Sequence, residues 1–161
     1  MGQIETRIAE RGLILPEPVQ MPEGVLLPFP EVNLRGNRAF VSGAGPLNPD
    51  GTLSGPFGKV GQDVTVDQAA HLAELTGLAM LAGLKRTLGD LDRITGWCRV
   101  FGMVNAAPNF SNPPAVINGF SHLILDLFGS QVGRHARSAV GMATLPMQIA
   151  VEIEAEVEFG D

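Results

Sequence analysis

The sequence has no tyrosine, a single cysteine, a single tryptophan and few charged residues, which make up 17% of its 161 positions. One cysteine excludes a disulfide within the chain and is typical of a reducing compartment, so we expect a cytoplasmic protein. No apolar run approaches the roughly 20 residues of a membrane-spanning helix, and we expect no membrane contact. Soluble domains carry about 25% charged residues. The shortage of charge indicates that other subunits cover part of the surface.

Clustered positive charge is also missing. The net charge is −6, the pI is near 5.0, and no basic run is longer than the pair Lys85-Arg86. Affinity for nucleic acid depends on grouped lysine and arginine side chains that neutralise phosphates. We therefore expect no nucleic-acid partner.

Motifs for metals and cofactors are incomplete. His71 with Glu74, and His122 with Asp126, have the spacing of ligands on one helix face, but no Cys/His cluster accompanies them. The two glycines within residues 43–45 lack the third glycine of a dinucleotide-binding motif. We expect neither a metal nor a cofactor.

The chain length fits one domain. Residues 1–24 are polar at first and then contain three prolines, so we expect an extended N-terminal arm there and a single domain over 25–161. Thr65 with Gln68 forms a capping box that starts a helix, which Gly89 ends. A second helix is expected from Pro113, capped by Asn112, to about Phe128.

Short β-branched and alternating runs predict the strands. We expect strands from Arg38, at 52–54, over 94–104, over 136–142 and over 149–159. Strands, helix, strand, helix and strands in this order predict an α+β fold, with a mixed sheet and two helices packed on one of its faces. The other face is expected to be uncovered.

Alternation along the last strand predicts which residues occupy that uncovered face. Val151 and every second residue after it are apolar and should face the helices, while Glu152 and its alternates should face away. If the last two strands form a hairpin about residues 144–145, Arg137 lies directly opposite Glu152 on the same face, and His135 has the parity of Arg137. Such a pair is either a solvated surface ion pair or part of a binding site. The small neighbours Ala139, Gly141 and Ala150 favour the binding site.

Three short stretches together resemble a known signature. Residues 136–140, the pair Leu145-Pro146 and residues 151–155 resemble the C-terminal signature of the Rid family, also called YjgF-type or endoribonuclease L-PSP, of reactive-intermediate deaminases. The resemblance covers about residues 26–159. It extends to the longer, chorismate-mutase-like members through Val104-Asn105, Pro108-Asn109-Phe110 and Asn118-Gly119-Phe120, and to the family's N-terminal hairpin through Asn33-Leu34, Asn37, Ser42-Gly43 and Pro46.

The resemblance implies a chorismate-mutase-like fold of the trimeric type and a homotrimer with clefts between subunits. It also implies hydrolysis of enamine or imine intermediates that carry a carboxylate, which gives a keto acid and ammonia. The partner is then a small carboxylate-bearing metabolite. Arg137 would hold its carboxylate and Glu152 would act on the attacking water. The other expected ligand-binding positions are Phe29, Ser42, Gly43, Asn105 and His135.

Two departures from the family pattern leave a second function open. Phe29 stands where active members place a tyrosine, and Ala139 stands where many have a cysteine. The alternative is a non-catalytic trimer of the same fold that binds small carboxylates for sensing or buffering. Ribonuclease activity fits poorly with the acidic charge, and chorismate mutase activity would rest on fold similarity alone.

Overall fold

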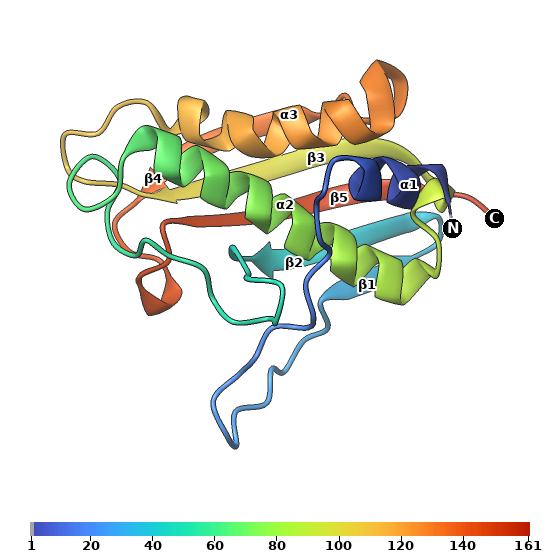
Figure 1. The fold of residues 1–161 in the computed structure, drawn as a ribbon, viewed down its shortest axis with the longest axis horizontal. Helices are drawn as coiled ribbons and strands as arrows, with labels where there is room; N and C mark the ends of the chain where they lie inside the picture. The colour runs from blue at the N-terminus through green and yellow to red at the C-terminus, as the bar shows by residue number, and fades with distance from the viewer. Residues whose placement is uncertain (1) are drawn as a thin grey trace.

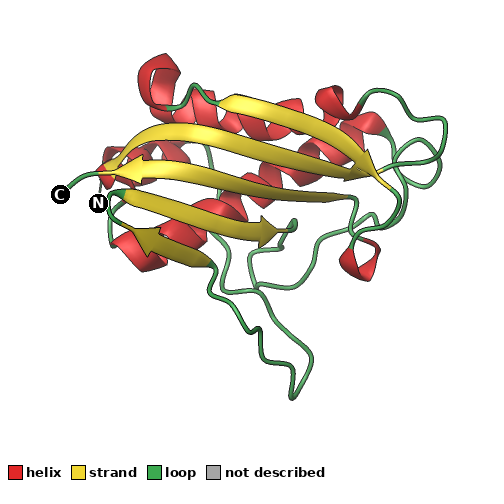
Figure 2. Ribbon diagram, turned by 180° about the vertical axis from the view of Figure 1, so that it is seen from behind, coloured by secondary structure: helices red, strands yellow, loops and turns green. Residues whose placement is uncertain are grey.

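A computed structural model describes residues 2–161 and has the expected α+β architecture (Figure 1). Its five-stranded mixed sheet has the strand order β1-β2-β5-β3-β4. The long helices α2 and α3 lie on one face of this sheet, and the other face is open in the described chain (Figure 2). The elements are α1 (Gln3–Glu10), β1 (Val32–Arg35), β2 (Arg38–Ala44), α2 (Val66–Leu88), β3 (Ile94–Asn105), α3 (Pro113–Val132), β4 (Ala136–Met142) and β5 (Val151–Phe159), with single 3-10 turns η1 (Leu91–Arg93) and η2 (Pro146–Gln148).

Local sequence signals place both long helices correctly. The Thr65 side chain accepts the Gln68 amide and the Gln68 side chain accepts the Thr65 amide, as the capping box predicts. Gly89 follows α2 with a φ of 84°, which favours glycine. Asn112 precedes Pro113 as expected, but its side chain makes no capping hydrogen bond. Gly129 interrupts α3 with a φ of 73°, close to where the sequence predicts its end.

The core lies between the sheet and the two helices. Val151, Ile153 and Val157 of β5 are fully buried there, which confirms the alternation predicted for this strand. Simple alternation fails on β3, because its register with β5 shifts between Trp97 and Arg99. Trp97 is therefore buried in the core and packs edge-on against Phe120 and Phe128 of α3.

The strand pairing differs from the predicted C-terminal hairpin. β4 pairs in parallel with β3, whereas β5 lies between β2 and β3 and is antiparallel to both. The reason is that α3 crosses over the sheet between β3 and β4, and a crossover of this kind joins parallel strands. The strand predicted at 52–54 is also wrong, since only one isolated bridge, Leu47 with Leu53, forms there.

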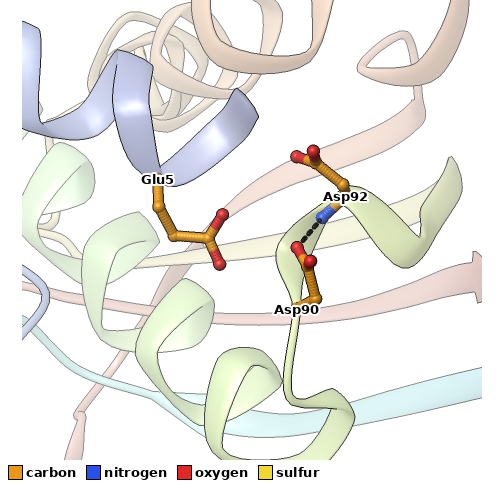
Figure 3. A group of neighbouring side chains, drawn as sticks. All are labelled: Glu5, Asp90 and Asp92. Carbon is orange, nitrogen blue, oxygen red and sulfur yellow. Dashed lines mark hydrogen bonds between the residues drawn. The ribbon is translucent and has the colours of Figure 1, made fainter. Parts of the chain in front are cut away.

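The N-terminal segment begins with a helix, where the sequence predicts an extended arm. Ile4 and Ile8 of α1 are buried in the main core, and residues 11–31 then form a long loop (Figure 1). Asp92 caps α1, because its carboxylate accepts the amides of Gln3 at 2.6 Å and Ile4 at 2.8 Å. Figure 3 shows Glu5 of α1 pointing toward the loop that carries Asp92. The helix is thus tied to the turn after α2.

Gly119 lies where α3 contacts α2, and replacing it with alanine should destabilise the fold. An added Cβ would stand 2.0 Å from the Ala70 carbonyl oxygen, so the two helices must move apart. We expect G119A to lower the free energy of unfolding by about 3 kcal/mol, measured by urea denaturation. G96A is the matched control, since the nearest atom to its Cβ, Glu158 Oε2, is 3.8 Å away. Equal stability of the two variants would contradict this packing.

Candidate functional site

The seven predicted site residues fall in three places. Four line one cavity, two lie beside α3 and one is buried at the end of β3. The four in the cavity are Phe29, Ser42, Gly43 and Glu152, the two beside α3 are His135 and Arg137, and the buried residue is Asn105.

The cavity has a volume of about 300 Å³ and lies where β2 and β5 meet the loop before β1. Its walls come from five parts of the chain: that loop, the sheet, the loop that follows β2, helix α2 and the turn η2. Most of the lining is apolar, and besides Phe29 it includes Val19, Met21, Leu27, Met80, Met147 and Ile149. An apolar pocket with a few polar groups at one end is the usual form of a small-molecule site.

Glu152 supplies a carboxylate to this cavity. The backbone of Gly43 makes room for it, because a Cβ at Gly43 would lie 3.2 Å from the Glu152 Cδ atom. A register shift between Val41 and Ala44 places this glycine beside the glutamate. Glu152 is half-buried and forms no ion pair among the described residues. Burial, assisted by the negative charge of Glu154, raises the pKa of Glu152.

Ser42 and Phe29 shape the same end of the cavity. The Ser42 hydroxyl donates to the Pro30 carbonyl at 2.8 Å, and its amide donates to the Glu31 carbonyl at 2.9 Å. These bonds tie the end of the loop to β2 and hold Phe29 at the cavity wall. The Phe29 ring is half exposed and also lines a groove on the open face of the sheet.

Arg137 lies on the opposite face of the sheet from Glu152. It pairs with Val100, which is fully buried beneath the helices, and its Nη1 donates to Asn118 Oδ1 at 2.9 Å and Ser121 Oγ at 3.1 Å, both on α3. Glu152 pairs with Met103 and faces the other way. The predicted Arg137–Glu152 pair on one face is therefore wrong for a single chain.

The small residues near Arg137 do not form the predicted hollow on the open face. Ala139 has the parity of Arg137 and packs against the core under α3. A Cβ on Gly141 would contact Ala106 and Pro113, at the start of α3. Ala150 is buried in the same core.

The guanidinium of Arg137 has an unusual set of partners. It is partly buried, and this loss of water lowers its pKa. Both of its bonded partners are neutral, and no carboxylate within residues 2–161 forms an ion pair with it. Nη1 uses both of its hydrogens on α3. The Nε–Nη2 edge, which suits a bidentate carboxylate, has no partner in the described part of the chain.

His135 forms the next link beyond Ser121. Its Nε2 lies 2.9 Å from Ser121 Oγ, its Nδ1 lies 2.7 Å from the Gly133 carbonyl oxygen, and its ring packs edge-on against Phe120. Burial and the positive charge of Arg137 lower the pKa of His135, although the Gly133 carbonyl acts in the opposite direction. The lowered pKa favours the neutral form of the ring.

Asn105 is not part of the cavity. It is fully buried, its Oδ1 accepts from Lys59 Nζ at 3.0 Å, and its Nδ2 donates to the Ile149 carbonyl at 3.3 Å. With both side-chain groups occupied, Asn105 joins the end of β3 to the segments beside it. Sequence reasoning gave neither Asn118 nor Ser121 a role in the site. Asn118 entered only as part of the resemblance to the longer family members, and the other signal was a polar pair three residues apart in a largely apolar helix.

The residues best placed to hold a metal ion are Glu5, Asp90 and Asp92, which each bring a carboxylate oxygen to within 4.8 Å of the others (Figure 3). Protein donors already serve this group. Asp92 caps α1, Asp90 accepts the Asp92 amide, and Glu5 accepts from Lys85 and the Leu91 amide. Burial alone would raise the pKa of Glu5, but these bonds lower it overall. The group attaches α1 to the domain.

No helix among the described residues is long and apolar enough to cross a membrane.

Comparison with known proteins gives consistent matches over nearly the whole chain. Residues 5–155 match the model of the family described as "YjgF/chorismate_mutase-like, putative endoribonuclease". Protein TCP17 of Trypanosoma cruzi is 40% identical over 126 residues, which cover 78% of each chain. The crystal structure of Atu1372, a protein of unknown function from Agrobacterium tumefaciens, is 40% identical, with a TM-score of 0.86 over 98% of this chain and 92% of that one.

A more distant structure shares the fold. RidA from the Antarctic bacterium Psychrobacter sp. is 17% identical, with a TM-score of 0.55 over 89% of this chain and 99% of that one. The family model spans the strand, helix and turn segments that form the cavity, and also Arg137 with its partners Asn118 and Ser121. The chain belongs to the YjgF/chorismate-mutase-like family.

Proposed function

We propose that this protein hydrolyses small enamine or imine intermediates that carry a carboxylate, with Arg137 binding the carboxylate and Glu152 acting as the base. The observation that carries the proposal is a pair of partly desolvated charges of opposite sign, neither of which has a counter-ion in the described chain. Partly buried charges without partners are costly. A ligand with a carboxylate at one end and a polar reactive centre at the other would satisfy both.

The two residues reach one ligand only if they come from different subunits. Within one chain the sheet separates them, since Arg137 lies against α3 and Glu152 lies on the open face. We therefore place the site between neighbouring subunits of a homotrimer. Arg137 on the edge strand β4 of one subunit would meet the cavity of the next. This arrangement also uses the open sheet face, where Phe40 is 40% exposed.

The chemistry requires one water molecule and one proton carrier. Water adds to the imine carbon while Glu152 takes a proton from it, so the new C–O bond forms as the C=N electron pair moves to nitrogen. Glu152 then returns the proton to that nitrogen, which gives a carbinolamine. Glu152 next takes the hydroxyl proton as the C=O bond forms and passes it to the nitrogen as the C–N bond breaks, so ammonia leaves and the keto acid remains. A raised pKa suits Glu152 to both steps, because a carboxyl group that titrates closer to neutrality accepts and returns a proton more readily.

The cavity lining favours an apolar substituent on the substrate over a nucleotide. Its wall is mainly aliphatic and aromatic, with Ser42, Gly43 and Glu152 at one end. The family description names an endoribonuclease. On this chain the alternate residues of β5 from Glu152 to Glu158 place four carboxylates on the open face, and these would repel phosphate.

E152Q tests the base. The amide cannot accept a proton from water, so we expect ammonia release from amino-acid-derived imines to fall at least about 100-fold, while calorimetry still detects binding of pyruvate or 2-oxobutyrate. E154Q, on the same strand and face, is the control and should stay active. Because the charge of Glu154 raises the pKa of Glu152, E154Q should move the acid limb of the rate profile to lower pH.

Binding without turnover in the wild type would favour the alternative function, a non-catalytic carboxylate-binding trimer, which the phenylalanine at position 29 also motivates.

R137A tests both the anchor and the shared site. Loss of a bidentate, charge-assisted contact should abolish keto-acid binding and turnover, whereas R99A should preserve both.

Co-expression of R137A and E152Q chains carrying different tags should restore activity, because some mixed sites receive a native residue from each chain. If the two chains are equally abundant and assemble at random, about one quarter of all sites contain both a native Arg137 and a native Glu152. No recovery in verified mixed oligomers would rule out the shared site, and a monomer by light scattering would rule out the assembly.

A further inference from the structure

We propose that His135 is a positioning residue: acting through Ser121, it holds Arg137 in the orientation that leaves one edge of the guanidinium free for a carboxylate. This inference rests on the ligand-binding role proposed for Arg137. It concerns a histidine that does not face the cavity and whose ring is bonded entirely within its own subunit.

The hydrogen-bond directions along this chain of groups follow from the one group that can only accept. The Gly133 carbonyl needs a donor, so His135 Nδ1 carries the proton and Nε2 is a bare acceptor. Ser121 must then donate its hydroxyl hydrogen to Nε2. The Ser121 oxygen is left to accept from Arg137 Nη1, at 3.1 Å. Neutral His135 thus fixes the serine in the rotamer that receives the arginine.

Asn118 completes the hold on the guanidinium. Its Oδ1 accepts the second Nη1 hydrogen at 2.9 Å, so two α3 side chains, one turn apart, clamp the same nitrogen. A planar guanidinium held at Nη1 has its Nε–Nη2 edge turned away from the clamp. Because this edge is already ordered before binding, a ligand that binds there pays a smaller entropy cost for fixing the arginine side chain.

A proton on His135 would break this sequence of bonds. Nε2–H would become a donor to Ser121 Oγ, so the serine hydroxyl hydrogen would lose its acceptor and the orientation that receives Arg137 Nη1 would no longer be held. It would also bring a second positive charge next to Arg137. The other charged groups nearby are Arg134, one residue earlier in the chain, and His122, exposed beside Ser121 on α3; Arg99 of β3 points to the other face of the sheet. No carboxylate in the described chain pairs with His135 or Arg137 to offset the repulsion.

The test measures pyruvate binding by calorimetry on the full chain between pH 5 and 8, in an E152Q background so that Glu152 does not titrate. Affinity should be constant near neutrality and should fall about tenfold per pH unit below the pKa of His135. The protein has three histidines, so NMR can follow the His135 ring directly. Pyruvate at saturation should lower its pKa further, because binding and protonation oppose each other.

Two substitutions separate positioning from packing. H135Q retains an acceptor for Ser121 but cannot titrate. We therefore expect its affinity for pyruvate to be close to that of the parent protein, which carries E152Q alone, and to show no pH dependence in this range. H135F retains the ring against Phe120 but has no acceptor, so we expect affinity at least about tenfold weaker at every pH. H122Q is the matched control and should leave both affinity and its pH profile unchanged.

The possible failures are distinguishable. If the parent protein binds no pyruvate at any pH, the proposed function fails and this inference fails with it. If the parent binds pyruvate but H135F binds equally well, or the affinity does not change as the His135 ring titrates, the positioning role is overturned while the proposed function stands.

Discussion

The parallel pairing of β4 with β3 is the constraint on which the candidate site depends. Parallel neighbours need a crossover, and here the crossover is α3, which therefore lies over the two strands that it connects. That position brings Asn118 and Ser121 above Arg137 and gives the guanidinium two neutral acceptors. It also fixes Arg137 on the helix side, away from Glu152. A hairpin between β4 and β5 would have placed both charges on one face as an ordinary ion pair.

The sequence is informative about elements and less so about their neighbours. Capping chemistry at Thr65, the glycine at 89 and the alternation of β5 are local, so they predict α2 and the buried face of the last strand. The partner of a strand is not local. Residues 136–142 have the same propensity beside β5 as beside β3, and the turn at 144–145 gives no sign that β3 lies between them. The family signature identified Arg137 and Glu152 without specifying that they occupy opposite faces. Asn118 and Ser121 acquire their role only from the crossover.

Arg137 and Glu152 make poor sense as stabilising residues. Each loses part of its hydration on folding, and neither gains an opposite charge within the described chain. Neutral hydrogen bonds to Arg137 return only part of that loss, and Glu152 lies beside Gly43, whose lack of a side chain leaves space for the carboxylate without a polar partner. Glu152 lies at the end of an apolar cavity, and Arg137 lies beneath a crossover helix. A binding role would explain why residues in these places lower the stability of the fold.

In the proposed trimer, assembly would act on the pKa of Glu152 in two opposite senses. Covering the open face removes more water from Glu152, which by itself raises its pKa further and favours the protonated form that cannot serve as a base. The approach of Arg137 from a neighbouring subunit lowers the same pKa, because a nearby positive charge favours the carboxylate. At a few ångströms in a poorly hydrated cleft, a direct charge is stronger than partial desolvation. A ligand carboxylate on Arg137 would neutralise that charge and let the pKa of Glu152 rise again. The base would then be best able to pass a proton back to nitrogen when substrate is bound. In the proposed site, the separation of the two residues on one chain would make the proton chemistry of Glu152 depend on both assembly and ligand.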